Sequence, residues 1–370
     1  MEINQYNRIE IDGNAVRHNL DVIQKYKHPK SRLMAIVKSN AYGHGLDVVA
    51  PYLQKRGVAF FGVHSMDEAV VLRKIGIKQY ILVMGPVSED EFLVAQKYGV
   101  AVVVHDIDTL KTFQKWPFYR KRKFDIHLKI ETGMNRLGMD FRILKDALKN
   151  DQKRRLSFEG LMSHIPDSLT QDARNGIRYF KECVDDIKKM GYPIKYHHVA
   201  RSALTFFHPE SHCDFVRVGI SLYGYHATRS LQESVPLEPI LSLKSKIVSL
   251  KAIRPGETVG YDRRFTAKRH MKIGVVPIGY GDGYHKLYGR FGKIIINDTL
   301  IPIVGDICMN MLMVDMTMVK DASVGNDVIL IGKSKSHQIT AYDLSEHAGF
   351  IPYEVLTSLS KDIKRVIVNA

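Results

Sequence analysis

Two residues able to do chemistry lie in or directly after short apolar runs. Lys38 follows AIV (35–37), and Arg217 lies inside FVRVGI (215–220). A lysine whose preceding residues are buried does not easily extend to water. In low-dielectric surroundings its pKa falls, so that the amine can act as a nucleophile or form a Schiff base. Lys38 is therefore a candidate nucleophile, although the same position suits a lysine that only caps a strand.

Two further residues suit an anion. Ser202 follows the apolar run that ends at Ala200, and Gly219 comes shortly after Arg217. A serine hydroxyl can donate to a phosphate, and a glycine lets backbone N–H groups approach an anion closely. A lysine that faces a phosphate site indicates pyridoxal phosphate, and Arg217 would then be the partner of the cofactor's ring nitrogen.

These residues need elements that bring them to one face. Between residues 33 and 223, short apolar runs alternate with amphipathic stretches such as 89–98, which Ser88 and Gly99 would cap. Eight such βα units predict a (β/α)8 TIM-type barrel with its active site at the carboxyl ends of the strands. An open doubly wound sheet is the alternative, but no Gly-x-Gly-x-x-Gly follows a run. The runs cover 33–38, 59–64, 80–85, 100–105, 124–130, 158–164, 196–200 and 215–220.

The pattern changes after Leu237. Alternating runs at 241–253, 293–297 and 311–316, separated by turn sequences, indicate an all-β domain with short helices only near 342–348 and 353–360. The glycine-rich GYGDGY (279–284) reads either as a hairpin turn or as part of a site. We predict two domains: a cofactor-binding barrel over residues 1–235 and a C-terminal β domain over residues 236–370.

Composition limits the functional classes. The chain has 370 residues, 45% apolar and 25% charged, which is typical of globular proteins. The net charge of +15 comes from short, scattered clusters without a nucleic-acid motif, so we expect no nucleic-acid partner. Neither a membrane-spanning apolar run nor a signal sequence is present, and the three cysteines form no CxxC pair, so we expect a cytoplasmic protein without a metal. The clusters are Lys25–Arg32, Arg120–Lys123, Lys153–Arg155 and Lys268–Lys272.

Six motifs, in order over nearly the whole chain, closely resemble the alanine racemase family. They are AIVKSNAYGHG (35–45), LKIETGMNRLGM (128–139), VRVGISLYG (216–224), VGY (259–261), GYGDGY (279–284) and IPYEVLTSLS (351–360). The resemblance implies a barrel followed by a β domain, pyridoxal 5'-phosphate and a head-to-tail homodimer with active sites shared between subunits. It also implies interconversion of L-alanine and D-alanine, which supplies D-alanine for peptidoglycan.

The resemblance assigns roles by matching position. Lys38 is similar to the lysine that links to the cofactor and acts as base on one face of the substrate, and Tyr261 of the partner subunit to the acid/base on the other face. Racemisation needs such a pair, because a proton leaves from one face and another returns to the opposite face. Arg217 matches the residue at the ring nitrogen, and His164 would orient it. The phosphate-binding positions match Tyr42, Ser202, Gly219, Ile220 and Tyr353.

The substrate side is assigned in the same way. Arg136 would contact the cofactor's phenolic oxygen and the substrate carboxylate, and Met309 of the partner subunit would bind that carboxylate through its backbone N–H. Tyr284 would line the entrance. Lys129 matches a position that is carbamylated in some relatives, where the carbamate braces Arg136.

The chain departs from the family pattern in ways that bear on substrate choice. Arg201 stands where relatives usually have asparagine, and Asn310 where most have aspartate. Racemisation of serine or of a broader set of amino acids is therefore an alternative to alanine. A barrel-type amino-acid decarboxylase is a further alternative, but such enzymes place an acidic residue at the ring nitrogen, and this chain has Arg217.

Overall fold

The computed structural model describes residues 6–116, 124–151 and 157–370, whose packing divides the chain into two compact units. One comprises Asn19–Ala41 and Val49–Leu222; the other comprises the chain up to His18, Tyr42–Val48 and Tyr223–Ala370. The basic clusters at 120–123 and 153–155 lie outside the described residues.

The first unit is the predicted barrel. Its eight parallel strands pair in the order β8-β7-β6-β5-β4-β3-β2-β9, and each predicted run overlaps one of them. A parallel bridge between Arg201 and Arg217 joins the chain after β8 to β9, so that the sheet nearly closes. The strands are β2 (Arg32–Ile36), β3 (Phe60–Val63), β4 (Tyr80–Val83), β5 (Ala101–Val104), β6 (Ile126–Lys129), β7 (Gly160–Met162), β8 (Tyr196–His198) and β9 (Phe215–Val218).

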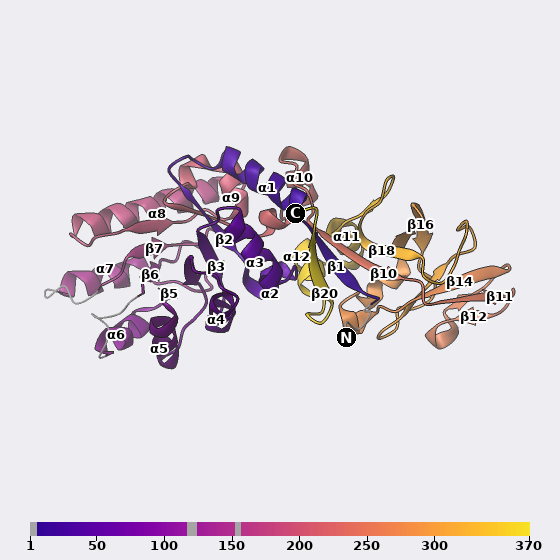
Figure 1. The fold of residues 1–370 in the computed structure, drawn as a ribbon. Helices are drawn as coiled ribbons and strands as arrows, with labels where there is room; N and C mark the ends of the chain where they lie inside the picture. Colours follow the sequence, from indigo (N-terminus) through magenta and orange to yellow (C-terminus); the bar gives the residue numbers. More distant parts are fainter. Residues whose placement is uncertain (1–5, 117–123, 152–156) are drawn as a thin grey trace. The chain divides into compact units, whose positions relative to one another are not determined.

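Helices follow the strands on the outside of the barrel (Figure 1). Helix α5 (Glu89–Tyr98) shows why they form where they do: Ser88 and Glu91 make a capping box at its start, and Gly99 ends it in the left-handed conformation at φ 58°. The other helices after the strands are α3 (Leu46–Lys55), α4 (Met66–Lys74), α6 (Ile107–Lys115), α7 (Phe141–Asn150), α8 (Gln171–Lys189) and α9 (Ser202–Phe207), whereas α2 (Lys38–Tyr42), directly after β2, is a short turn with non-helical dihedral angles.

The second unit consists mostly of strands, as predicted. Its main sheet has the order β16-β15-β18-β10-β1-β20, with β19 paired to β18, and smaller sheets have the orders β11-β14-β17 and β12-β13. The bounds in the main sheet are β1 (Arg8–Asp12), β10 (Leu241–Lys246), β15 (Lys293–Ile296), β16 (Thr299–Pro302), β18 (Asp327–Lys333), β19 (Gln338–Ile339) and β20 (Lys364–Val368). Those in the smaller sheets are β11 (Ser249–Ile253), β12 (Thr258–Val259), β13 (Phe265–Thr266), β14 (Met271–Val276) and β17 (Leu312–Asp315).

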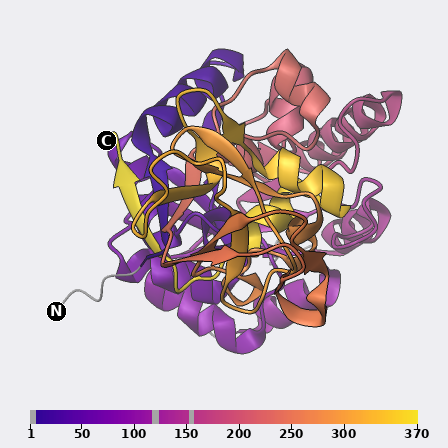
Figure 2. The same cartoon turned by 90° about the vertical axis from the view of Figure 1, so that its right-hand side faces the viewer.

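Strand β1 lies in this second unit, whereas we assigned residues 1–235 to the barrel domain. It pairs antiparallel with β10 and parallel with β20, which places segments from opposite ends of the sequence side by side (Figures 1 and 2). Helix α1 (Gly13–Tyr26) then leads from β1 into the barrel unit.

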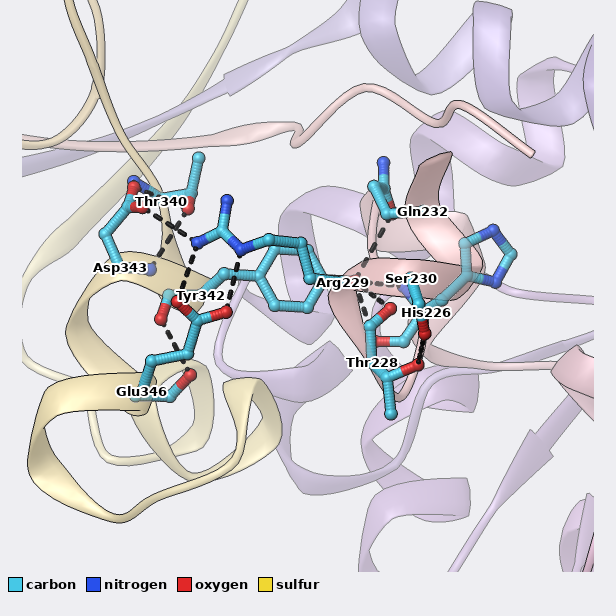
Figure 3. Close-up of polar contacts among 10 residues, drawn as sticks. His226, Thr228, Arg229, Ser230, Gln232, Thr340, Tyr342, Asp343 and Glu346 are labelled. Atoms are coloured by element: carbon cyan, nitrogen blue, oxygen red, sulfur yellow. Dashed lines mark hydrogen bonds and ion pairs between the residues drawn. The ribbon is translucent and has the colours of Figure 1, made fainter. Parts of the chain in front are cut away.

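Three helices accompany the strands of this unit: α10 (Arg229–Ser234), α11 (Ala341–Ala348) and α12 (Pro352–Thr357). The last two agree with the predicted helical stretches. Arg229 ties α10 to α11 through Asp343 (2.9 Å) and Glu346 (2.7 Å), as Figure 3 shows. No helix in the described part of the chain is both long and apolar enough to span a membrane.

Candidate active site

Lys38 lies at the carboxyl end of β2, where the backbone makes an unusual turn. The next four residues, Ser39–Tyr42, all have φ between 52° and 54°. Each L-residue in this left-handed region costs about 1–2 kcal/mol. The Ala41 N–H donates to the Val37 carbonyl at 2.9 Å, which closes the turn. Backbone strain of this kind is concentrated at functional sites.

Glu68 in α4 holds this turn, a role that we did not predict. Its carboxylate accepts hydrogen bonds from the Ser39 N–H at 2.5 Å and from the His64 N–H at 2.8 Å. The sequence did indicate the position of Glu68, because the spacing of Ser65 and Glu68 fits a capping box at the start of α4. Glu68 therefore connects the strained turn after β2 to the neighbouring βα unit.

The Lys38 amine lies in a cationic environment within the barrel. Burial lowers its pKa, the charge of Arg136 lowers it further, and Glu68 acts in the opposite direction. Lys129 at the end of β6 is 5% exposed, and its pKa falls to about 8 because of burial and the charges of Arg217 and Arg136. These four basic residues come from β2, β6, the segment after β6, and β9, at the face where the sequence placed the site. Their shared positive charge favours an anionic ligand.

Arg217 is buried, and its guanidinium is held from several sides. Nη1 donates to His198 Nδ1 at 2.8 Å and to the His198 carbonyl at 2.9 Å, while Nη2 donates to the carbonyls of Ser163 (2.7 Å) and Val199 (3.2 Å). Nε has no acceptor among the residues that the structure describes. Arg217 is thus fixed in orientation while one N–H stays available for a ligand.

The histidine that contacts Arg217 is His198, not His164 as we predicted. His164 is half-buried, and its pKa falls to about 2, first because of burial and then because of the charges of Arg217 and Arg201. His198 is the last residue of β8 and His164 lies two residues after β7, but only the His198 ring hydrogen-bonds the guanidinium. His164 is therefore a neutral residue close to the cationic group rather than its hydrogen-bond partner.

The predicted anion-binding residues of the barrel meet each other. The Gly219 N–H donates to Ser202 Oγ at 3.0 Å, and Ile220 is 2% exposed in the turn that follows β9. Because Ser202 Oγ accepts from Gly219, its own hydroxyl proton is free to be donated to a ligand. This pair joins the start of α9 to the end of β9.

Tyr42 and Tyr353 meet in the second unit. Their ring centroids are 6.0 Å apart, and burial raises the pKa of Tyr42 well above its usual range. Gly43, at φ 82°, allows this contact, because a Cβ there would lie 2.0 Å from the Leu356 carbonyl oxygen. The left-handed glycine therefore lets α12 pack directly against the backbone at Gly43.

Tyr261 and Met309 are exposed in the second unit, at 70% and 57%. Tyr261 follows Gly260, and the turn after it is flanked by Arg264, which contacts Asp306 at 3.4 Å. GYGDGY is not a hairpin turn: residues 280–282 form a 3₁₀ turn whose Gly281 N–H donates to the Met309 carbonyl at 2.7 Å. The loop that carries Met309 is thereby held beside this turn.

Comparison with known proteins assigns the chain to a family. A model described as the alanine racemase N-terminal domain matches residues 11–227, and one described as the C-terminal domain matches residues 240–367. The chain belongs to the alanine racemase family. It is 34% identical to the alanine racemase of Citrifermentans bemidjiense over 98% of both proteins, and 32% identical to that of Methanococcus maripaludis over 97% of this chain and 98% of that protein.

Solved structures show the same relationship. The alanine racemase of Bacillus anthracis with bound L-Ala-P has a TM-score of 0.91 and 29% identity, and the match covers all of this chain and 96% of that one. The alanine racemase of Clostridium difficile 630 has a TM-score of 0.92 and 28% identity, covering 99% of this chain and 97% of that one. The chain is accordingly an amino-acid racemase, an isomerase.

The barrel residues fit pyridoxal phosphate, the cofactor of the alanine racemase family. Lys38 offers a half-buried amine with a lowered pKa, and Arg217 offers its Nε–H. Ser202, at the start of α9, offers a hydroxyl proton beside Gly219. The positive charge around Lys38 would compensate an anionic phosphate and a substrate carboxylate. These observations agree on one ligand class without requiring a metal ion.

Tyr284 does not have the position that we predicted. It is fully buried, packs edge-to-face on Tyr288 with ring centroids 5.0 Å apart, and its hydroxyl has no hydrogen-bond partner among the described residues. A side chain that is buried within its own unit does not line an entrance. The glycine-rich and polar sequence around it, GYGDGYHK (279–286), gave no indication of this burial.

The two departures from the alanine racemase pattern differ in setting. Arg201 turns to the loop after β7, where Nε donates to the Ile165 carbonyl at 3.0 Å and Nη2 to the Pro166 carbonyl at 2.9 Å. Asn310 is exposed beside Met309. The arginine is thus bound to backbone, whereas the asparagine stands on the loop to which the family resemblance assigns substrate contact.

Proposed function

We propose that the chain interconverts L-alanine and D-alanine with pyridoxal phosphate, using Lys38 and Tyr261 of the partner subunit on opposite faces of the substrate. The observation that carries this proposal is the half-buried Lys38 amine, which a strained turn holds at the carboxyl end of β2 among Arg136, Lys129 and Arg217. The printed names of the relatives support alanine as the substrate.

Each residue has a defined task in this proposal. The bound cofactor withdraws electrons from the substrate and so makes its α-hydrogen acidic. Lys38 Nζ removes or returns that proton on one face, which requires a neutral amine and therefore benefits from its lowered pKa. Tyr261 Oη does the same on the other face. Arg217 keeps its proton, so it donates to the ring nitrogen and leaves that nitrogen unprotonated.

A homodimer is part of the same proposal. The exposure of Tyr261 and Met309 supports it, because a side chain that serves a second chain must lie on the surface of its own. Arg136, the proposed contact of the cofactor's phenolic oxygen and the substrate carboxylate, is also exposed. Tyr42, Ser202, Gly219, Ile220 and Tyr353 are the residues that we propose for the phosphate.

We also propose that Lys129 carries a carbamate. Carbon dioxide adds to a neutral amine, and the pKa of Lys129 near 8 leaves a usable neutral fraction at physiological pH. The resulting negative charge would face Arg136 and Arg217. Labelling with ¹³C-bicarbonate should give a carbamate carbon signal that is absent from Lys129→Ala; an identical spectrum for both proteins would contradict the proposal.

The decisive variant is Tyr261→Phe, which removes only a hydroxyl. We expect kcat for L-alanine to fall by about 10²–10⁴-fold, the usual contribution of a general acid or base. Binding of pyridoxal phosphate, measured by its absorption when attached to Lys38, should not change. Tyr280→Phe is the matched control, because Tyr280 is also an exposed tyrosine of the second unit, at 45%.

The outcome separates the parts of the proposal. Equal activity of the two variants would exclude Tyr261 as an acid/base, and absence of cofactor absorption in the unmodified protein would exclude the whole proposal. Rescue of a D-alanine-requiring bacterium by this chain would support a role in supplying peptidoglycan, and failure to rescue despite activity in vitro would contradict that role.

A further inference from the structure

We propose that Tyr80 is a positioning residue for Arg217 and acts through a buried hydrogen-bond relay formed by His127 and His198. This inference rests on the proposed function, in which Arg217 contacts the ring nitrogen of the cofactor. Neither Tyr80 nor His127 belongs to the residues assigned above, and both lie away from the Lys38 turn.

The relay is a continuous set of short contacts inside the barrel. Arg217 Nη1 lies 2.8 Å from His198 Nδ1, His198 Nε2 lies 2.8 Å from His127 Nδ1, and His127 Nε2 lies 2.9 Å from the Tyr80 hydroxyl. The four residues come from β9, β8, β6 and β4. Tyr80 is the first residue of its strand and His198 the last of its own, so the relay runs across the barrel from one end toward the other.

The chemistry of arginine gives the relay a single direction. A guanidinium only donates, so His198 Nδ1 must accept and His198 must carry its proton on Nε2. His127 Nδ1 then accepts from His198, which places the proton of His127 on Nε2. Tyr80 Oη consequently accepts from His127. Each tautomer is fixed by the preceding bond, and hydrogen bonds aligned in this way strengthen one another.

The surroundings keep every intermediate member neutral. Burial and the charge of Arg217 lower the pKa of His127 to about 3, and the same two causes hold the pKa of His198 well below its usual range. Burial and then the charge of Asp125 raise the pKa of Tyr80. The phenol therefore keeps its proton while it accepts from His127, and the relay has no second protonation state at neutral pH.

A separate observation shows that the neighbouring strand leaves space for the His127 ring. Gly160, the first residue of β7, faces it so closely that a Cβ would lie 2.4 Å from His127 Nδ1 and 2.6 Å from its Cγ. The φ of Gly160 is not in the left-handed region. Backbone conformation therefore does not require glycine there, whereas the space occupied by the ring does.

Loss of the Tyr80 hydroxyl would change the orientation of Arg217 through a series of steps. His127 Nε2–H would lose its acceptor in a buried site, so the opposite tautomer would gain in population. In that tautomer His127 Nδ1 carries a proton and repels the proton on His198 Nε2. His198 could then no longer hold Arg217 Nη1 in one orientation.

The test compares Tyr80→Phe with Tyr196→Phe. Tyr196 is a matched control, because its ring centroid lies 6.0 Å from that of Tyr80 and 5.9 Å from that of His127, yet its hydroxyl bonds to neither relay histidine. The purified proteins, labelled with ¹⁵N-histidine, are examined by two-bond ¹H–¹⁵N correlation, which distinguishes protonated from bare ring nitrogens. His127→Gln and His198→Gln assign the signals.

We expect both relay histidines to be Nε2–H tautomers in the unmodified protein. Tyr80→Phe should shift the nitrogens of His127 and His198, and Tyr196→Phe should leave them in place. Unchanged nitrogens in Tyr80→Phe, or equal shifts in both variants, would overturn the relay. This measurement needs neither substrate nor cofactor. It therefore tests the relay even if the proposed function is disproved.

Activity then tests the positioning role. Loss of one net hydrogen bond from the relay predicts a fall in kcat of about two- to tenfold for Tyr80→Phe, with KM for alanine unchanged. KM should not change because Arg217 is not assigned to the substrate. A shifted spectrum with unchanged kcat would overturn the positioning role, and a rise in KM alone would do the same.

Discussion

His197 and Asp214 form an ion pair whose strength depends on pH. His197 Nδ1 lies 2.6 Å from Asp214 Oδ2, and the same oxygen accepts from the His197 backbone N–H at 2.7 Å. The hydrogen bond to Asp214, and then a contact with Cys213, raise the pKa of His197 to about 9. A raised histidine pKa adds stability that is fully present below its ordinary pKa of about 6.5 and is lost as the pH rises through about 9.

We therefore expect the free energy of unfolding to fall between pH 7 and pH 10 by about 1–2 kcal/mol from this pair, given its partial exposure. Urea unfolding of the unmodified protein and of Asp214→Asn measures this. The difference between the two proteins should be largest near pH 7 and should disappear above pH 10. A difference that stays constant across this range would exclude the pair as its origin.

Residue types and positions indicated several residues of the candidate site, whose roles stay predictions. Lys38 and Arg217 were identifiable because a basic residue in or just after a buried strand is unfavourable unless it is paired or has a function. The contact of Ser202 with Gly219 was expected because each residue follows one of two neighbouring strands. The choice between His164 and His198 was not predictable, because both follow apolar runs and only the packed barrel determines which ring reaches β9. Tyr80 looked like an ordinary strand residue.

At the scale of elements, the sequence predicted helix ends correctly, but it did not predict which strands pair when they are far apart in the chain. Ser88 and Gly99 bound α5 as predicted, because capping depends on neighbours in the chain. The segment RIEID alternates in burial along β1, yet its partners are far away in sequence. A short strand without a hairpin carries no sequence signal for its partner, so β1 was assigned to the barrel.

The contact between α10 and α11 leads to a prediction at this scale. Arg229 bonds Glu346 through both Nε (2.7 Å) and Nη2 (3.2 Å), and bonds Asp343 at 2.9 Å (Figure 3). All three side chains are about half exposed. Arg229→Met should therefore reduce the free energy of unfolding by about 1 kcal/mol in low salt, and by less in 1 M NaCl.

Arg229→Lys should recover less than half of that loss, because lysine lacks the planar fork that bonds two oxygens at once. Arg178→Met is the control: Arg178 and Glu182 are exposed on α8 at a separation of 4.0 Å, and their loss should cost about 0.3 kcal/mol at most. Urea unfolding measures all three variants. Equal losses for Arg229→Met and Arg178→Met would show that the three-way contact adds nothing beyond a single surface pair.

At the scale of the whole molecule, the proposed sharing of sites can be tested by mixing inactive chains. Lys38→Ala and Tyr261→Phe should each be nearly inactive alone. A mixed dimer of the two has one site with both residues intact and one site with neither. Because one of its two sites is intact, the isolated mixed dimer should show about half of the original activity per dimer, whereas an unseparated random assembly, in which half of the dimers are mixed, should show about a quarter.

Co-expression of the two chains with different affinity tags, followed by isolation of the mixed dimer, measures this. A mixed dimer without activity would show that Lys38 and Tyr261 serve the same site from one chain. A single variant that stays fully active by itself would show that its residue has no part in catalysis.

The position of β1 between β10 and β20 also constrains how the protein is made. Strand β1 leaves the ribosome first, but its parallel partner begins only at Lys364. At a synthesis rate of about 5–20 residues per second, β1 waits roughly 20–70 s for that partner. The barrel strands are complete by Val218 and can form during this interval. A chain stalled before Lys364 should therefore carry a folded barrel and an open sheet edge, which is a natural place for a chaperone to bind.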